Sequence, residues 1–174
     1  MLLFTTVSGS CILCGGLLAR VERIRPRWLE QELRHTIIAF GGGILVAAIA
    51  FVLVPEGQAY FRAPILGVAI FLLGGLAFMQ VERFLSKKQQ DLPQTIAMML
   101  DFVPESIAMG GMFALGSPSA PLLAVFIGLQ NLPEGFNAYR EIRAAAGDRK
   151  HGTLMIMSLM IFLGPVAGML GWYI

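Results

Sequence analysis

Charged residues, histidine and cysteine are all scarce in this chain of 174 residues. Only 14% of the residues are Asp, Glu, Lys or Arg, and 56% are apolar, whereas roughly a quarter of the residues in soluble domains are charged. This composition excludes an ordinary soluble domain. Two cysteines are too few for a disulfide framework, and a net charge of +2 excludes a strongly basic nucleic-acid binder. We therefore expect an integral membrane protein with no nucleic-acid partner.

Long apolar runs take the place of the missing charges. Each run approaches the roughly 20 residues that an α-helix needs to cross a bilayer, and together they cover residues 2–19, 36–54, 63–80, 94–115, 120–139 and 153–174. We expect an all-α integral membrane protein with six transmembrane helices in a single domain, residues 1–174, embedded in the lipid bilayer. The connection 116–119 is so short that the fourth and fifth spans must form an antiparallel pair.

Basic residues predict the orientation of the spans. Of the 13 lysines and arginines, only Arg62 lies in an even-numbered connection, and all the others lie in or beside the first, third and fifth connections. Arg and Lys near span ends favour the cytoplasmic side of a membrane. The odd-numbered loops are therefore predicted to be cytoplasmic and both termini exterior.

Three acids lie inside the apolar runs. Asp101 and Glu105 belong to the fourth span and Glu134 to the fifth, and no Lys, Arg or His lies inside any predicted span. An unpaired charge at the bilayer centre costs on the order of 3 kcal/mol. A cation from outside the chain is the simplest way to compensate these acids. The alternative is a structural role, in which protonated carboxyls bond to neighbouring hydroxyl groups.

The two acidic spans carry the same pattern. Residues 101–105 and 130–134 both read polar-x-x-Pro-Glu, so that an oxygen-bearing side chain and a glutamate share one helical face. Each proline removes one helical hydrogen bond, and we expect it to bend its helix. The pattern therefore predicts a central antiparallel pair of proline-kinked helices with facing polar groups.

The depth of these groups follows from the helical rise of about 1.5 Å per residue. In an antiparallel pair, Glu105 lies level with Gln130, and Asp101 lies level with Glu134. Carboxylate and amide oxygens suit a divalent cation. The predicted metal-site residues are Asp101, Glu105, Gln130, Asn131 and Glu134.

These stretches resemble the ZIP (Zrt/Irt-like) family of divalent metal transporters, whose fourth and fifth helices carry Pro-Glu motifs. Residues 129–135, LQNLPEG, are similar to the fifth-helix motif of the prokaryotic-type branch, and residues 40–57, which begin FGGG and end PEG, are similar to the second helix. The resemblance implies that Asp101, Glu105, Gln130 and Glu134 form the main transport site and that Asn131 belongs to an adjoining second position. It also implies the plasma (inner) membrane of a prokaryote.

The chain departs from the family pattern at three points. Asp101 and Phe102 stand where the family has His-Asn, and Gly164 stands where many members have a glutamate. We therefore expect one metal site instead of two. The six spans are also two fewer than the family normally has, so the resemblance implies either a bundle completed by a partner subunit, such as a homodimer, or a reduced variant.

The function predicted from these residues is transport of a divalent metal ion toward the cytoplasm, and the protein is not expected to be an enzyme. Zn²⁺ is the cargo that the resemblance implies, and a site without histidine also suits Mn²⁺, Fe²⁺ or Cd²⁺. Clustered carboxylates bind protons, so uptake is expected to weaken in acid. The alternative function is that of a non-transporting metal-binding or accessory membrane subunit derived from such a transporter.

Two further pairs of small residues lie within the spans. Cys11 and Cys14 form C-x-x-C in the first span and are interpreted as packing residues. Gly164 and Gly168 form G-x-x-x-G in the sixth span. This pair packs either within the bundle or against another subunit, and the sequence does not choose between these alternatives.

Overall fold

The computed structural model of the chain describes residues 1–21, 27–61, 63–88, 94–146 and 150–174, and within these ranges it contains helices and no strand. The elements are α1 (Leu2–Val21), α2 (Arg27–Ala48), the π-helical segment η1 (Ile49–Leu53), α3 (Val54–Ala59), α4 (Pro64–Lys88), α5 (Gln94–Ala114), α6 (Ala120–Ala146) and α7 (Lys150–Tyr173). The all-α prediction is thus confirmed for these ranges. Some loop arginines used to predict the orientation lie outside them, namely Arg23, Arg25, Arg62 and Arg149.

Each predicted span falls on one helical segment, and α2, η1 and α3 together form the second of them. In the described part of the chain, four segments are long and apolar enough to cross a membrane: Leu2–Val21, Gln31–Ala59, Pro64–Phe84 and Thr153–Tyr173. The helices α5 and α6, which contain the acids and amides, are not among these four. Helices long and apolar enough to cross a membrane are therefore present, and the count of six spans stays a prediction.

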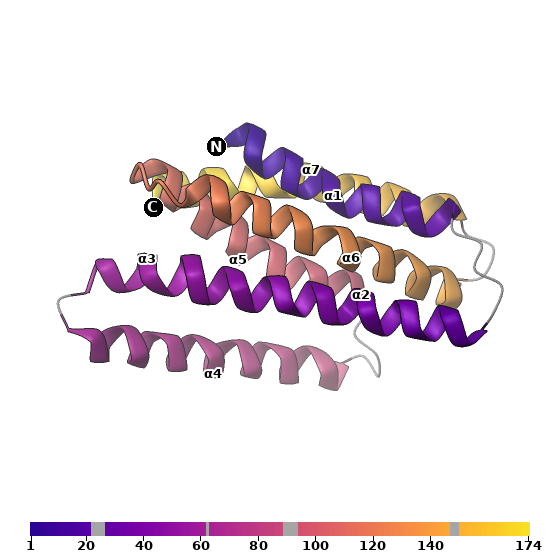
Figure 1. Cartoon of the computed structure of the whole chain (residues 1–174), viewed down its shortest axis with the longest axis horizontal. Coiled ribbons are helices and arrows are strands. Elements are labelled where there is room, and N and C mark those ends of the chain that lie inside the picture. Colours follow the sequence, from indigo (N-terminus) through magenta and orange to yellow (C-terminus); the bar gives the residue numbers. More distant parts are fainter. Residues whose placement is uncertain (22–26, 62, 89–93, 147–149) are drawn as a thin grey trace.

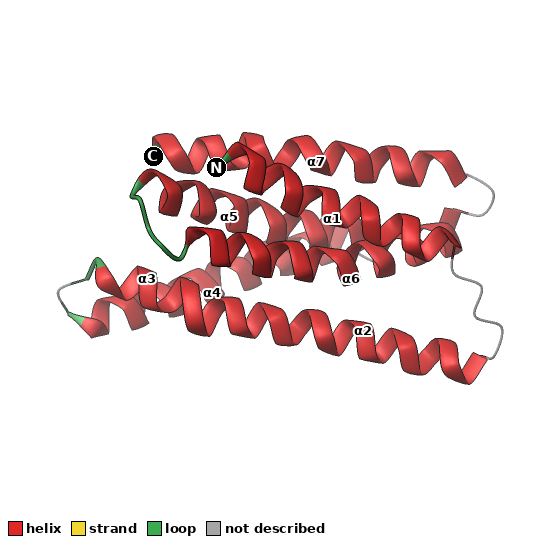
Figure 2. Cartoon of the chain, turned by 45° about the horizontal axis from the view of Figure 1, so that its top comes forward, coloured by secondary structure: helices red, strands yellow, loops and turns green. Residues whose placement is uncertain are grey.

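The helices form a bundle with one peripheral member (Figure 1). The helices α1, α5, α6 and α7 pack together, α2 lies along α6, and α4 packs against α3 at the edge of the molecule. None of the described side chains of α4 is buried, and its surface is apolar from Pro64 to Met79. Figure 2 shows α4 beside α3, away from α7.

Glycine allows the closest helix contacts. A Cβ atom on Gly15 of α1 would collide with the backbone of α6, and one on Gly135 of α6 would collide with the backbone of α1. Gly110 and Gly171 have the same relationship between α5 and α7. Backbones approach this closely only where side chains are absent, so these glycines fix which helices are neighbours.

The G-x-x-x-G pair of α7 packs within the bundle. A Cβ atom on Gly164 would lie 2.7 Å from Cζ of Phe102 and 2.8 Å from the carbonyl oxygen of Thr5. A Cβ atom on Gly168 would lie 2.8 Å from Cγ2 of Thr5. The structure thus decides the alternative that the sequence left open, because these glycines contact α1 and α5 of the same chain.

The connection between α5 and α6 forms the predicted antiparallel hairpin. Gly116 has a φ of +68°, a left-handed conformation that glycine adopts without strain. Ser117 Oγ donates a hydrogen bond of 2.6 Å to Oε1 of Glu56 at α3 and accepts one of 3.1 Å from the backbone N–H of Ser119. Pro104 and Pro133 both lie inside helices that continue past them, and the bend expected at each stays a prediction.

Candidate metal site

Three of the predicted site residues meet between α5 and α6. The amide nitrogen Nε2 of Gln130 donates hydrogen bonds to Oε1 of Glu105, at 3.4 Å, and to Oε1 of Glu134, at 3.0 Å. The contact between Glu105 and Gln130 agrees with the level predicted from the helical rise. Gln130 therefore links two carboxyl groups that come from different helices.

The remaining oxygens of this group are buried without partners. Glu105 is 8% exposed and Gln130 is 1% exposed. Within the described residues, Oε2 of Glu105, Oε1 of Gln130 and Oε2 of Glu134 have no hydrogen-bond partner. A buried acceptor left without a partner costs about 1–3 kcal/mol. The group therefore offers three acceptor oxygens that a cation can stabilise.

Asp101 lies one helical turn before Glu105 on α5, and its side chain is half-buried. Among the described residues, no hydrogen bond or ion pair joins Asp101 to Glu134, its predicted partner. The structure thus keeps Asp101 on the helix face of Glu105 and leaves it outside the hydrogen-bonded group.

Asn131 is directed toward another helix. Its Nδ2 donates a hydrogen bond of 2.9 Å to the carbonyl oxygen of Ser8 on α1. The Oγ of Ser8 in turn donates one of 3.0 Å to the carbonyl oxygen of Ala124 on α6. These two bonds join α1 to α6, so Asn131 contributes to helix packing beside the group formed by Gln130.

Asn137 was not singled out from the sequence. It is 6% exposed, and its Oδ1 lacks a hydrogen-bond partner among the described residues. Its position seven residues after Gln130 places both side chains on one face of α6. This spacing is the signal that could have found it. Ser106 Oγ and Asn131 Oδ1 are two further buried oxygens that lack partners in the same ranges.

The cluster contains too few acidic side chains to form a metal centre from carboxylates alone. Across the parts of the chain that the structure describes, no three side chains of His, Cys, Asp or Glu are grouped so that they could hold a metal ion. Two carboxylates and one amide meet, and any third carboxylate ligand requires Asp101 to move.

Cys11 and Cys14 of α1 are free thiols. Cys11 is half-buried and Cys14 is exposed.

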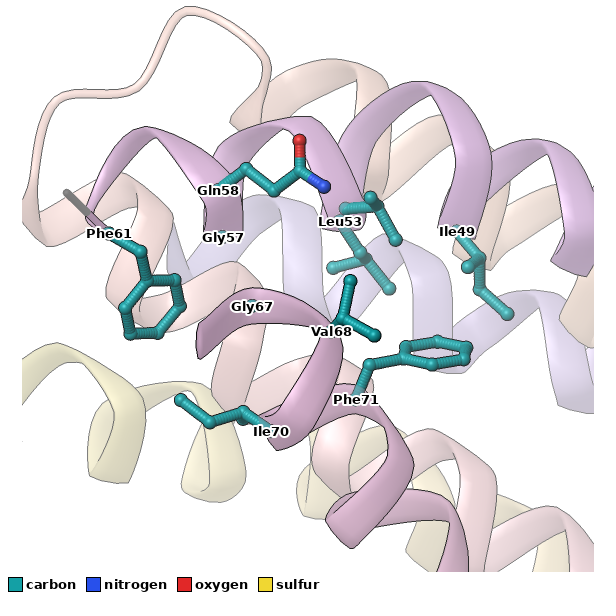
Figure 3. Close-up of a pocket in the computed structure, with 10 residues that line it drawn as sticks. Ile49, Leu53, Gly57, Gln58, Phe61, Gly67, Val68, Ile70 and Phe71 are labelled. Carbon is teal, nitrogen blue, oxygen red and sulfur yellow. The ribbon is translucent and has the colours of Figure 1, made fainter. Parts of the chain in front are cut away.

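A separate cavity of about 460 Å³ lies between α4 and the η1–α3 segment. Figure 3 shows Leu53, Val68 and Phe71 at this cavity, with Gln58 as a polar side chain near it. Among the described residues, no charged side chain lines it. An apolar cavity of this kind does not suit an ion, so the polar group between α5 and α6 is the candidate site.

Comparison with known proteins gives no match. No protein-family model matches the chain, and neither the curated proteins nor the solved structures include a match.

Proposed function

We propose that this protein binds a divalent metal ion between α5 and α6 and carries it across the membrane toward the cytoplasm. The observation that supports this function most directly is the set of three buried oxygens without partners on Glu105, Gln130 and Glu134. They lie in a helical bundle whose other members include four segments apolar enough to cross a bilayer. No covalent step is part of this function.

Charge balance supports a cation as the ligand. The sequence between residues 94 and 139 contains no Lys, Arg or His, so the two helices of the site bring no positive side chain to this depth. Burying carboxylates without an opposite charge is costly in a medium of low dielectric constant. A divalent cation supplies the missing charge and satisfies several oxygens at once.

Gln130 gives this site a simple way to change state. With Nε2 toward the acids, its amide donates to both carboxyl groups and stabilises the site without a metal. Rotation of the amide by half a turn exchanges Nε2 for Oε1, which is an acceptor. The rotated amide and the two carboxylates then present oxygen to one point. In this proposal, binding of the ion therefore accompanies a flip of the Gln130 amide.

The ligand set also bears on the identity of the ion. Oxygen ligands alone do not select strongly for Zn²⁺, which binds nitrogen and sulfur well. We propose Zn²⁺ as the cargo, because of the resemblance to ZIP transporters, with Mn²⁺, Fe²⁺ or Cd²⁺ as further ions of the same site. Asp101 is proposed as a further ligand that joins when the ion binds.

The test is metal uptake by proteoliposomes that contain the purified protein and a fluorescent Zn²⁺ indicator. We expect saturable uptake that falls by about 100-fold in Glu105→Gln and Glu134→Gln, since each loses a charged ligand. Glu32→Gln, which changes an exposed acid of α2, is the matched control and should keep wild-type uptake. Equilibrium dialysis with Zn²⁺ measures binding in the same samples.

The possible outcomes separate the two functions. Uptake that needs both glutamates supports a transporter. Tight binding without uptake contradicts transport and supports the metal-binding or accessory subunit. Absence of Zn²⁺, Mn²⁺, Fe²⁺ and Cd²⁺ binding, or binding that is unchanged in both glutamine variants, overturns the proposed site.

A further inference from the structure

Polar side chains continue along α6 beyond the proposed metal site. Gln130, Glu134, Asn137 and Glu141 follow one another at intervals of four, three and four residues, and this spacing places them on one helix face. At the helical rise of about 1.5 Å per residue, successive members lie about 4.5–6 Å apart along the axis. We call these four residues the α6 polar stripe. It leads from the site to the end of the bundle where α6 ends. We call this the arginine-rich end, because it carries Arg20 of α1, Arg34 of α2, and Arg140 and Arg143 of α6.

Asn137 occupies the middle of this stripe and is 6% exposed. On α2, Gly41 faces Pro133, with 3.3 Å between its ideal Cβ and Cγ of the proline. Seven residues earlier on α2, Arg34 bonds to Glu141 at 2.8 Å.

These two contacts show that α2 and α6 run antiparallel, and counting along both helices puts Asn137 level with Ile37 and Ile38. On α5, the contact between Glu105 and Gln130 sets the register, which puts Asn137 level with Met98. Neither an isoleucine nor a methionine side chain can donate a hydrogen bond. The described residues supply no hydrogen-bond donor to Oδ1 of Asn137.

An ion pair lies at the end of the stripe. Arg34 NH2 and Glu141 Oε1 are 2.8 Å apart, with 52% and 41% of the two side chains exposed. Ion pairs that are this accessible to water are weak and open readily. The pair also places a positive charge at the point where a cation that follows the stripe would leave the protein.

We infer that the α6 polar stripe is the path by which the cation leaves the site toward the arginine-rich end of the bundle. Asn137 Oδ1 is the next oxygen ligand after Glu134, and the ion pair between Arg34 and Glu141 closes the path. The departing cation competes with Arg34 for the carboxylate of Glu141. The arrival of the cation therefore breaks this ion pair and opens the path. This inference rests on the proposed function, which provides the ion.

The closure is tested without any metal. In a Cys11→Ala, Cys14→Ala background, Asn137→Cys is treated with a cationic methanethiosulfonate reagent, and the labelling rate is measured by mass spectrometry. We expect Arg34→Gln to raise this rate about two- to fivefold, the change that corresponds to loss of a half-exposed ion pair. The control is Ala138→Cys, which changes the adjacent, fully buried position and should stay unreactive with or without Arg34→Gln.

The ligand role of Asn137 is tested by separating binding from uptake. Asn137→Leu keeps the size of the side chain and removes its oxygen, so Zn²⁺ affinity at the main site should stay within about twofold of wild type, because the site is a separate group. Uptake should fall about tenfold, because one step of the path loses its ligand. Asn137→Asp keeps an oxygen and should retain uptake.

The outcomes distinguish this inference from the proposed function. If the wild type neither binds nor carries any of the four ions, the proposed function fails, and this inference fails with it. If the wild type transports but Asn137→Leu transports equally well, only the inference is overturned. Labelling of Asn137→Cys that does not respond to Arg34→Gln also overturns the closure, whatever the metal measurements show.

Discussion

Phe102 on α5 and Gly164 on α7 are complementary in shape. The ring of Phe102 is fully buried, and its Cζ lies 2.7 Å from the position that a Cβ atom on Gly164 would take. The resemblance to ZIP transporters implies metal ligands at both positions. Here an aromatic ring fills the space between the helices instead, and the expectation of one metal site stays a prediction.

Replacement of Gly164 by alanine should destabilise the bundle. The new methyl group would press on the Phe102 ring and on the carbonyl oxygen of Thr5. We expect a loss of about 1–3 kcal/mol of unfolding free energy, typical of overpacking, measured by SDS titration in mixed micelles. Gly43→Ala is the control, because nothing lies within 4 Å of its new methyl group. Equal effects of the two substitutions would contradict the proposed fit.

Asn131 is predicted to act on packing more than on metal affinity. Asn131→Ala removes the hydrogen bond to the carbonyl oxygen of Ser8 and should lower the free energy of unfolding by about 1–3 kcal/mol. Its Zn²⁺ affinity should stay closer to wild type than that of Gln130→Ala, which removes an amide from the site itself. Isothermal titration calorimetry compares the two variants. A larger affinity loss in Asn131→Ala would assign Asn131 to the metal.

Ser117 is predicted to hold the hairpin connection against α3. Ser117→Ala removes the hydrogen bond to Glu56 and the acceptor of the Ser119 N–H. The unfolding free energy should fall by about 0.5–1.5 kcal/mol, measured by the same SDS titration. Ser119→Ala serves as the control, because the contact uses only its backbone nitrogen. A decrease in the control as large as that in Ser117→Ala would show that this contact does not hold the loop.

Acid should weaken metal binding. Protons and the cation compete for the carboxylate oxygens of Glu105 and Glu134, so affinity rises as the pH is raised and protons leave. Calorimetry in two buffers with different heats of ionisation measures the protons released per metal bound. Glu105→Gln, where one carboxylate is gone, should release fewer. Binding that releases no proton and does not vary between acidic and neutral pH would speak against carboxylate ligands.

Several features were predictable because they depend on residues close together in sequence. Apolar runs fix the helices, and a four-residue connection forces α5 and α6 to be antiparallel. That Glu105 and Gln130 lie at the same depth in the bundle then follows from the helical rise. Asn137 was missed because its spacing from Gln130, the one signal in the sequence, does not by itself show that the amide is buried. Its burial depends on the packing of α6 against helices that are far away in the sequence.

The sequence by itself determined that this protein is helical and that several helices can cross a membrane. It also showed that the pattern polar-x-x-Pro-Glu occurs twice. Composition and periodicity carry this information, because helix formation and lipid burial act over short stretches of chain. Only the tertiary structure decided how each helix is rotated about its axis. That rotation turns Gln130 toward Glu105 and Asn131 toward α1, and it is set by glycine contacts such as that of Gly135, where the backbones of separate helices meet.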